Sequence, residues 1–143
     1  MRLQQQRVRV RGMKIVLLSD MTKNELLVNF CIAYKQILSK HDLISPLSTA
    51  RLIKEATSLQ PETYSSDIDS IYSRLASLAF YNEIDAVICL RDPVQTPSES
   101  QQRLFQACDV NSIPFATNTA TAEILVHAIN RGDLDWRELL RSS

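Results

Sequence analysis

The chain has 143 residues, 45% of them hydrophobic, which is enough for one well-buried core and too little for two. Its 16 basic and 16 acidic residues cancel. The cancellation is uneven, because four arginines and no acidic residue precede Met13: Arg2, Arg7, Arg9 and Arg11. From Met13 onward, 12 basic residues face 16 acidic ones. This balance argues against nucleic-acid binding, which needs a clustered basic face.

The chain also lacks the marks of membrane, secreted and metal-binding proteins. No stretch reaches the roughly 18 apolar residues of a membrane helix, and none has the order of a signal peptide. Three cysteines, Cys31, Cys89 and Cys108, lie far apart and match neither a zinc nor a disulfide spacing. We therefore expect reduced, buried thiols, no metal and no membrane partner, in a cytoplasmic protein.

Residues 1–12, "MRLQQQRVRVRG", have two interpretations. They are a basic arm for a polyanion, or a disordered leader before a second possible start at Met13. We favour the leader, since twelve residues without a core contact usually stay disordered. Residues 13–143 then form a single domain.

Short β-branched runs alternate with amphipathic segments from Met13 onward, which is typical of βαβ units. Strands are predicted at 14–18, 42–45, 85–90 and 113–117, and a fifth in "PETYSS" although Pro61 and Glu62 disfavour it. A first helix, capped by Asp20 or Thr22, should run to Leu38. The second helix is predicted to begin at Ser48 as its cap and to run for about ten residues, and the third to span 67–80. A fourth should run through Ala107, a fifth should span 121–130 and end at Gly132, and "LDWRELL" should form the last one. This order predicts a three-layer α/β/α sandwich with a mainly parallel five-stranded sheet.

Polar residues follow each predicted strand, in "SDMTK", "SPLSTA", "SSDIDS", "RDPVQTP" and "ATNTAT". Helix capping alone explains many of them, because Ser, Thr, Asp and Asn are the preferred caps. Ligands of open α/β proteins, however, bind beyond the carboxyl ends of the strands. We therefore expect Asp20, Lys23, Asp92 and Asn118 to converge on one crevice.

Several segments carry a family resemblance: "MKIVLLSDMTK", "AYKQILSKHDL", "IKEATSLQ", "IDAVICLRDP", "CDVNSIPFATNTATAEIL" and "LDWRELL". From Met13 to about Arg141 the chain resembles the methylglyoxal synthases. The resemblance implies the conversion of dihydroxyacetone phosphate into methylglyoxal and phosphate, without metal or organic cofactor. It also implies an aspartate as base and a homo-oligomer, a hexamer.

The phosphate-binding positions of the family are altered in this chain. The family's first strand usually ends His-Asp and carries a lysine three residues beyond the aspartate, where this chain has Ser19, Asp20 and Lys23. Its phosphate loop, Thr-Gly-Thr-Thr-Gly, corresponds to residues 46–50, which keep two hydroxyls, Ser48 and Thr49, and no glycine. A proline has no N–H and a leucine disfavours positive φ, so a tight amide cradle is hard to form.

The catalytic positions are altered as well. Where the family has Ser-Gly-Pro-x-Gly-Gly-Asp, this chain has residues 66–72, and Tyr72 stands at the position of the base. A phenol with a pKa near 10 is a poor base at pH 7. Asp67 and Asp69 are the alternative bases. After Asp92, the family's histidine and aspartate are replaced by Ser98 and Ser100.

Three interpretations follow for function. We favour a methylglyoxal synthase-like protein that has lost the reaction and acts as a binding or regulatory homologue, with neutral decay as its counterpart. The alternative is an active lyase that uses Asp69 or Asp67 as base. The expected ligand is phosphate or a phosphorylated small molecule, weakly bound, with no cofactor. The candidate binding residues are Ser19, Asp20, Lys23, Ser48, Thr49, Ser66, Asp92 and Ser98.

Overall fold

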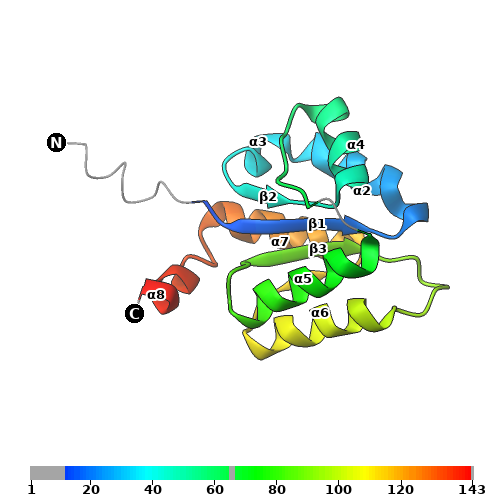
Figure 1. The fold of residues 1–143 in the computed structure, drawn as a ribbon. Helices are drawn as coiled ribbons and strands as arrows, with labels where there is room; N and C mark the ends of the chain where they lie inside the picture. The colour runs from blue at the N-terminus through cyan, green and yellow to red at the C-terminus, as the bar shows by residue number, and fades with distance from the viewer. Residues whose placement is uncertain (1–11, 65–66, 143) are drawn as a thin grey trace.

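The computed structural model describes residues 12–64 and 67–142 and has a parallel sheet at its centre (Figure 1). Within the described residues the sheet has four strands in the order β2-β1-β3-β4. They are β1 (Lys14–Ser19), β2 (Asp42–Ile44), β3 (Ala86–Leu90) and β4 (Phe115–Ala116). Every residue of β3 is buried and the strand lies between β1 and β4, which confirms the prediction of a central strand in "DAVICL".

Helices cover both faces of the sheet. After the short 3-10 helix η1 (Met21–Lys23), they are α2 (Asn24–Ala33), α3 (Lys35–Leu38), α4 (Leu47–Thr57), α5 (Ile68–Phe80), α6 (Glu99–Val110), α7 (Thr119–Arg131) and α8 (Trp136–Ser142). Successive residues of β1 point to opposite faces. Ile15 packs in one core with residues of α2, α3, α4 and α7, and Val16 packs in the other with residues of α5 and α6. The predicted three-layer α/β/α sandwich is therefore confirmed.

The predicted fifth strand is wrong. Of the segment around Pro61, only Glu62 pairs with the sheet, as an isolated parallel bridge to Ile44. Its N–H donates to the carbonyl of Leu43 and its carbonyl accepts from the N–H of Ser45. Pro61 has no N–H to donate, so the pairing does not extend toward it.

Two predicted helix starts differ from the structure. The first helical region is η1, α2 and α3 rather than one helix, because the backbone leaves helical geometry at Tyr34 (φ −111°, ψ 24°). Neither Asp20 nor Thr22 is its side-chain cap. Further on, Ser48 is not a cap but lies in the first turn of α4, whose N-cap is the extended Pro46. Proline fixes its own φ near the observed −61°, and this favours an earlier helix start.

Other helix ends form as the sequence indicates. The side chain of Asp67 caps α5, and that of Asn118 caps α7. Ser98 and Gln101 form a capping box at the start of α6. Gly132 ends α7 with φ 85°, a left-handed conformation that glycine adopts without a steric penalty.

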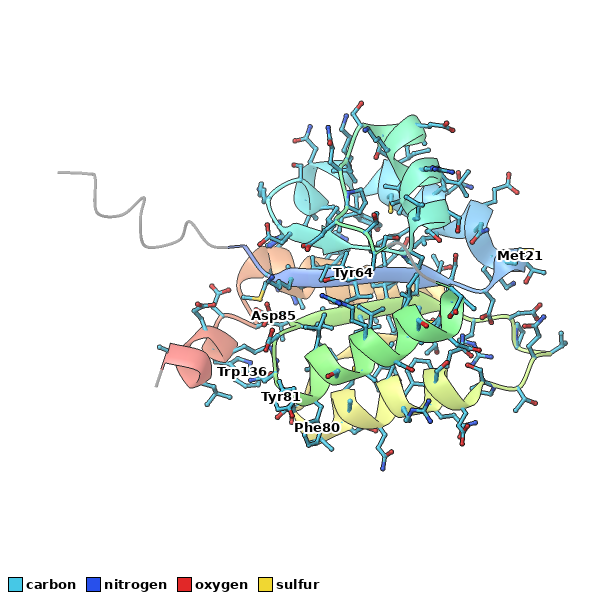
Figure 2. All side chains as sticks on the ribbon, in the orientation of Figure 1. Met21, Tyr64, Phe80, Tyr81, Asp85 and Trp136 are labelled. Carbon is cyan, nitrogen blue, oxygen red and sulfur yellow. The ribbon has the colours of Figure 1, made fainter. Side chains whose placement is uncertain are left out.

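The buried Arg137 anchors α8 at the amino edge of the sheet. Its Nε donates to Asp85 Oδ1 at 3.1 Å, and its other nitrogens donate to Asn82 Oδ1 and to the carbonyls of Ile84, Asn111 and Ser112. Figure 2 shows Asp85 and Trp136 at the end of the molecule opposite Met21. This anchor is therefore remote from the carboxyl edge.

The described part of the chain also bears on the cysteines and on membrane-spanning helices. Cys31, Cys89 and Cys108 are free and buried, as predicted. No helix of residues 12–64 and 67–142 is long and apolar enough to cross a bilayer. The predicted leader falls almost wholly on residues outside the described part.

Candidate functional site

Asp20 and Arg91 follow the two central strands directly, so they stand at the carboxyl edge of the sheet. Asp20 N–H donates to the carbonyl of Leu90 at 2.8 Å, and Arg91 N–H donates to the carbonyl of Thr117 at 3.0 Å. The first bond continues the β1–β3 pairing beyond the strand ends, and the second ties the end of β3 to the segment that follows β4. The site residues are thus mounted on the sheet itself.

The Asp20 carboxylate accepts three hydrogen bonds. Its Oδ2 accepts from Arg91 Nε at 2.9 Å and from Asp92 N–H at 2.7 Å, and its Oδ1 accepts from Gln101 Nε2 at 3.2 Å. Only 11% of the Asp20 side chain and 12% of the Arg91 side chain are exposed. The pair is a nearly buried, charge-assisted contact.

Tyr72, which the family resemblance places at the position of the base, is 4% exposed. Its hydroxyl accepts from Gln101 Nε2 at 3.2 Å and lies 3.6 Å from Cys89 Sγ. Gln101 therefore bridges Asp20 and Tyr72 with one amide nitrogen. The phenol is part of the packed layer between the sheet and α5.

The alternative bases occupy the start of α5. Asp69 is exposed, and its Oδ1 accepts from Ser100 Oγ at 3.2 Å. Ser100 Oγ in turn lies 3.2 Å from Ser98 Oγ. Asp67 is also exposed and accepts from Ser70 N–H as the helix cap. Asp69 is thus joined to the start of α6, whereas Asp67 serves its own helix.

The environment fixes the protonation of these groups. Burial favours the neutral form of Asp20, but the bonds from Asp92, Arg91 and Gln101 outweigh it and lower the pKa of Asp20 below its usual value. Burial raises the pKa of Tyr72 and raises that of Cys89 to about 11. Asp20, Tyr72, Cys89, Arg91 and Gln101 form one contact cluster. At neutral pH this cluster therefore holds an ionised Asp20 beside a neutral phenol, which cannot act as a general base.

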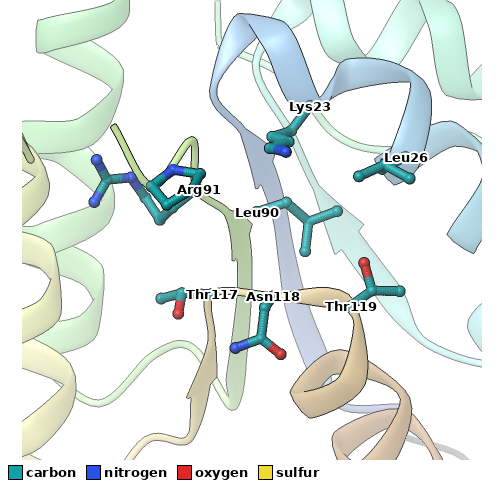
Figure 3. Close-up of a pocket in the computed structure, with 8 residues that line it drawn as sticks. Lys23, Leu26, Leu90, Arg91, Thr117, Asn118 and Thr119 are labelled. Carbon is teal, nitrogen blue, oxygen red and sulfur yellow. The ribbon is translucent and has the colours of Figure 1, made fainter. Parts of the chain in front are cut away.

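A cavity of about 440 Å³ opens beside this cluster, on the side of the sheet covered by α2 and α7. Its polar lining comes from Lys23, Arg91, Thr117, Asn118 and Thr119, and its apolar lining from Leu26, Leu90 and Pro93. Figure 3 shows the Arg91 guanidinium pointing away from Lys23 and Asn118. The cavity and the Tyr72 cluster thus lie on the two faces of the sheet.

The structure brings some of the predicted binding residues together and separates others. Lys23 and Asn118 line the cavity, while Asp20 belongs to the cluster. Asp92 links the segment between β3 and α6 to η1, because its Oδ2 accepts from Thr22 Oγ1 at 2.8 Å. The cavity lining thus includes Lys23 and Asn118 but not Asp20 or Asp92.

The remaining candidates that the structure describes lie outside the cavity lining. Ser19 Oγ donates to Asn24 Oδ1 at 2.6 Å. Ser48 is exposed on α4, Thr49 is buried, and Ser98 caps α6. Ser66 falls outside the described residues. Among the residues that are described, no three His, Cys, Asp or Glu side chains gather as a possible metal site.

Sequence reasoning missed Arg91 and Gln101. Gln101 follows Ser98 by three residues, the spacing of a capping box, so its place at a helix start was readable. Its contacts to Asp20 and Tyr72 span 81 and 29 residues of sequence. No local pattern encodes such contacts.

Comparison with known proteins now adds to this geometry. No family model matches the chain. It is 47% identical over 130 residues to a methylglyoxal synthase of Caldicellulosiruptor saccharolyticus, covering 90% of this chain and 92% of that protein. It is 41% identical over 129 residues to one of Bacillus mycoides, covering 89% and 98%. The crystal structure of methylglyoxal synthase from Elizabethkingia anophelis matches with a TM-score of 0.72 at 26% identity, over 80% of this chain and 77% of that one. The chain belongs to the methylglyoxal synthase family.

Proposed function

We propose that this member of the family binds a small phosphorylated compound at the carboxyl edge of its sheet and does not catalyse the family's lyase reaction. The expected ligand class is a triose phosphate or inorganic phosphate. The role is that of a binding or regulatory homologue.

One observation carries the proposal: Tyr72, the residue that the family resemblance places at the position of the base, is a buried phenol. Proton abstraction from a substrate carbon needs a group that reaches the carbon and is deprotonated at working pH. The Tyr72 hydroxyl is directed to Gln101 and Cys89, with a raised pKa. By the same resemblance, residues 46–50 stand in place of the family's glycine-containing phosphate loop, and without glycine a tight backbone grip on the leaving phosphate is hard to form.

The binding half of the proposal depends on Lys23. It is the half-buried cation on the cavity side of the site, and an ammonium is a suitable partner for a phosphate oxygen. Ser48 and Thr49 are the hydroxyls that the family resemblance assigns to the same anion. We expect millimolar rather than micromolar affinity.

A paired assay tests the proposal. Methylglyoxal and phosphate release from dihydroxyacetone phosphate are measured for this chain and for an authentic synthase, in parallel with calorimetric titration of inorganic phosphate. Binding without turnover supports the proposal. Turnover comparable with that of the authentic synthase refutes its catalytic half, and no heat of binding refutes its other half.

An active lyase is the second candidate, and the contact between Asp69 and Ser100 favours it. Asp69 is an exposed carboxylate close to the cluster, three residues before Tyr72 and held at 3.2 Å by a serine of α6. If Asp69 is the base, Asp69→Asn abolishes turnover while Asp67→Asn keeps it. Equal activity of both variants would exclude Asp69.

The family resemblance supports two further proposals. The chain would act in the cytoplasm, as a homo-oligomer and by resemblance a hexamer. Light scattering of the purified full chain tests the assembly, and a single protomer mass at micromolar concentration would refute it.

A further inference from the structure

The cavity between the start of α2 and the start of α7 combines the positive charge of Lys23 with an apolar wall. We propose that it binds a short-chain organic monocarboxylate, with the carboxylate at Lys23 and the carbon chain against Leu26, Leu90 and Pro93. This ligand class goes beyond the phosphorylated compound proposed above. The inference holds whether or not the lyase reaction is lost.

The charge of the cavity matches a monoanion. Two cations line it, but the Arg91 guanidinium is turned away and donates to Asp20 Oδ2 and to the carbonyl of Gln95, both at 2.9 Å. Its charge is therefore balanced by Asp20. Among the described residues, Lys23 remains as the lining cation that is not paired with Asp20, so it compensates one negative charge of a ligand and leaves a second uncompensated.

The apolar wall favours a carbon chain on that anion. Leu90 is 2% exposed and forms part of the buried core, while Leu26 is 43% exposed on the first turn of α2. Pro93 completes this side of the lining. Apolar groups that cover Leu26 remove its surface from water, which is favourable in proportion to the area buried.

The polar residues opposite are neutral and suit the second carboxylate oxygen. Asn118 Oδ1 already accepts from Thr121 N–H and Oγ1, both at 3.0 Å, so its amide nitrogen is the donor it can offer. Thr117 and Thr119 add hydroxyls to the same lining. These groups donate hydrogen bonds without adding charge, which again fits a monoanion better than a phosphate dianion.

Chain length gives a sharp test on the full protein. Acetate, propionate, butyrate and valerate are titrated in turn, followed by amide chemical shifts. Affinity should rise about threefold to fourfold with each methylene in the wild type. Leu26→Ser should flatten this series, and Lys23→Gln should weaken every acid about tenfold. Because Leu26 is partly exposed, its variant is expected to fold.

Leu52→Ser is the matched control, since Leu52 is 39% exposed on α4 and does not line the cavity. It should keep the wild-type series. A flat series in the wild type, or equal slopes in Leu26→Ser and Leu52→Ser, would overturn the inference. Inorganic phosphate titrated in parallel separates the two proposals: carboxylates that bind without phosphate support only this one, and the reverse supports only the proposed function.

Discussion

Asp85 and Arg137 form a salt bridge in which both side chains are fully buried. Lys14 N–H also donates to Asp85 Oδ2 at 2.8 Å, so the same carboxylate joins β1 to α8. Backbone carbonyls and Asn82 Oδ1 accept hydrogen bonds from the guanidinium, and Arg137 Nε and Lys14 N–H donate to the carboxylate. Such a pair is costly to break because one partner is left buried and charged.

Arg137→Ala should therefore lower the free energy of unfolding by about 3 to 5 kcal/mol. Arg131→Ala is the matched control, because its ion pair with Asp133 is exposed and should change stability by less than about 1 kcal/mol. Urea denaturation of both variants measures the difference. Equal midpoints would show that α8 does not depend on this contact.

Tyr72→Asp should not restore lyase activity. The new carboxylate would replace a side chain that is 4% exposed, and residues 46–50, which the resemblance aligns with the phosphate loop, would still contain no glycine. We expect a loss of stability on the order of 3 kcal/mol, as for other uncompensated buried charges. Tyr72→Phe keeps the ring and loses the bond from Gln101, which should cost about 1 kcal/mol. Methylglyoxal formed by Tyr72→Asp at the rate of an authentic synthase would contradict this expectation.

His41 should make stability sensitive to mild acid. Burial lowers the pKa of His41 below its ordinary 6.5, and its Nδ1 accepts from Met13 N–H at 3.0 Å. The unfolded chain therefore binds a proton more readily than the folded one, and stability rises with pH across this interval. The contribution of neutral His41 to the free energy of unfolding is complete above pH 6.5, and it is lost as the pH falls toward the lower pKa of the folded state.

His41→Gln should reduce this pH dependence, and the exposed His127→Gln should leave it in place. Thermal midpoints at pH 7.5 and 5.5 provide the measurement. The same drop in both variants would assign the effect to other groups.

Phosphate affinity should respond in opposite directions to two charge changes. Lys23→Ala removes the lining cation that is not paired with Asp20 and should weaken binding of inorganic phosphate. Asp67→Asn keeps a side chain that can cap α5. It removes the negative charge next in sequence to Ser66, a predicted phosphate-binding residue, so it should strengthen phosphate binding. Calorimetric titration checks both, and unchanged affinity in both would place the anion elsewhere.

Much of the fold was readable from the sequence because its signals are local. The apolar run of β3 and the caps Asp67, Ser98 and Asn118 depend on neighbouring residues. The break at Tyr34 was not readable, because hydrophobic spacing continues across it to Leu38. The pairing of Glu62 with a single residue of β2 likewise depends on how the chain passes the sheet edge.

The site was readable only as a location. The position of Asp20 and Lys23 just after the first predicted strand placed them at the carboxyl edge of the sheet, and both lie there. The division between cavity and cluster was hidden, since it depends on which face of the sheet each side chain takes. Gln101 of α6 and Arg91 after β3 both donate to the Asp20 carboxylate. Contacts of this kind join distant segments, so no periodic pattern in the sequence predicts them.

The hydrogen bonds from Asp20 to Leu90 and from Arg91 to Thr117 also bear on motion at the site. An amide that donates to a backbone carbonyl beside a buried strand exchanges its hydrogen with solvent only when that part of the structure opens. These two amides should therefore exchange as slowly as those inside β3, although they lie at the start of connecting segments. A ligand would meet donors and charges that are already in position, and its association would not wait for a loop to become ordered.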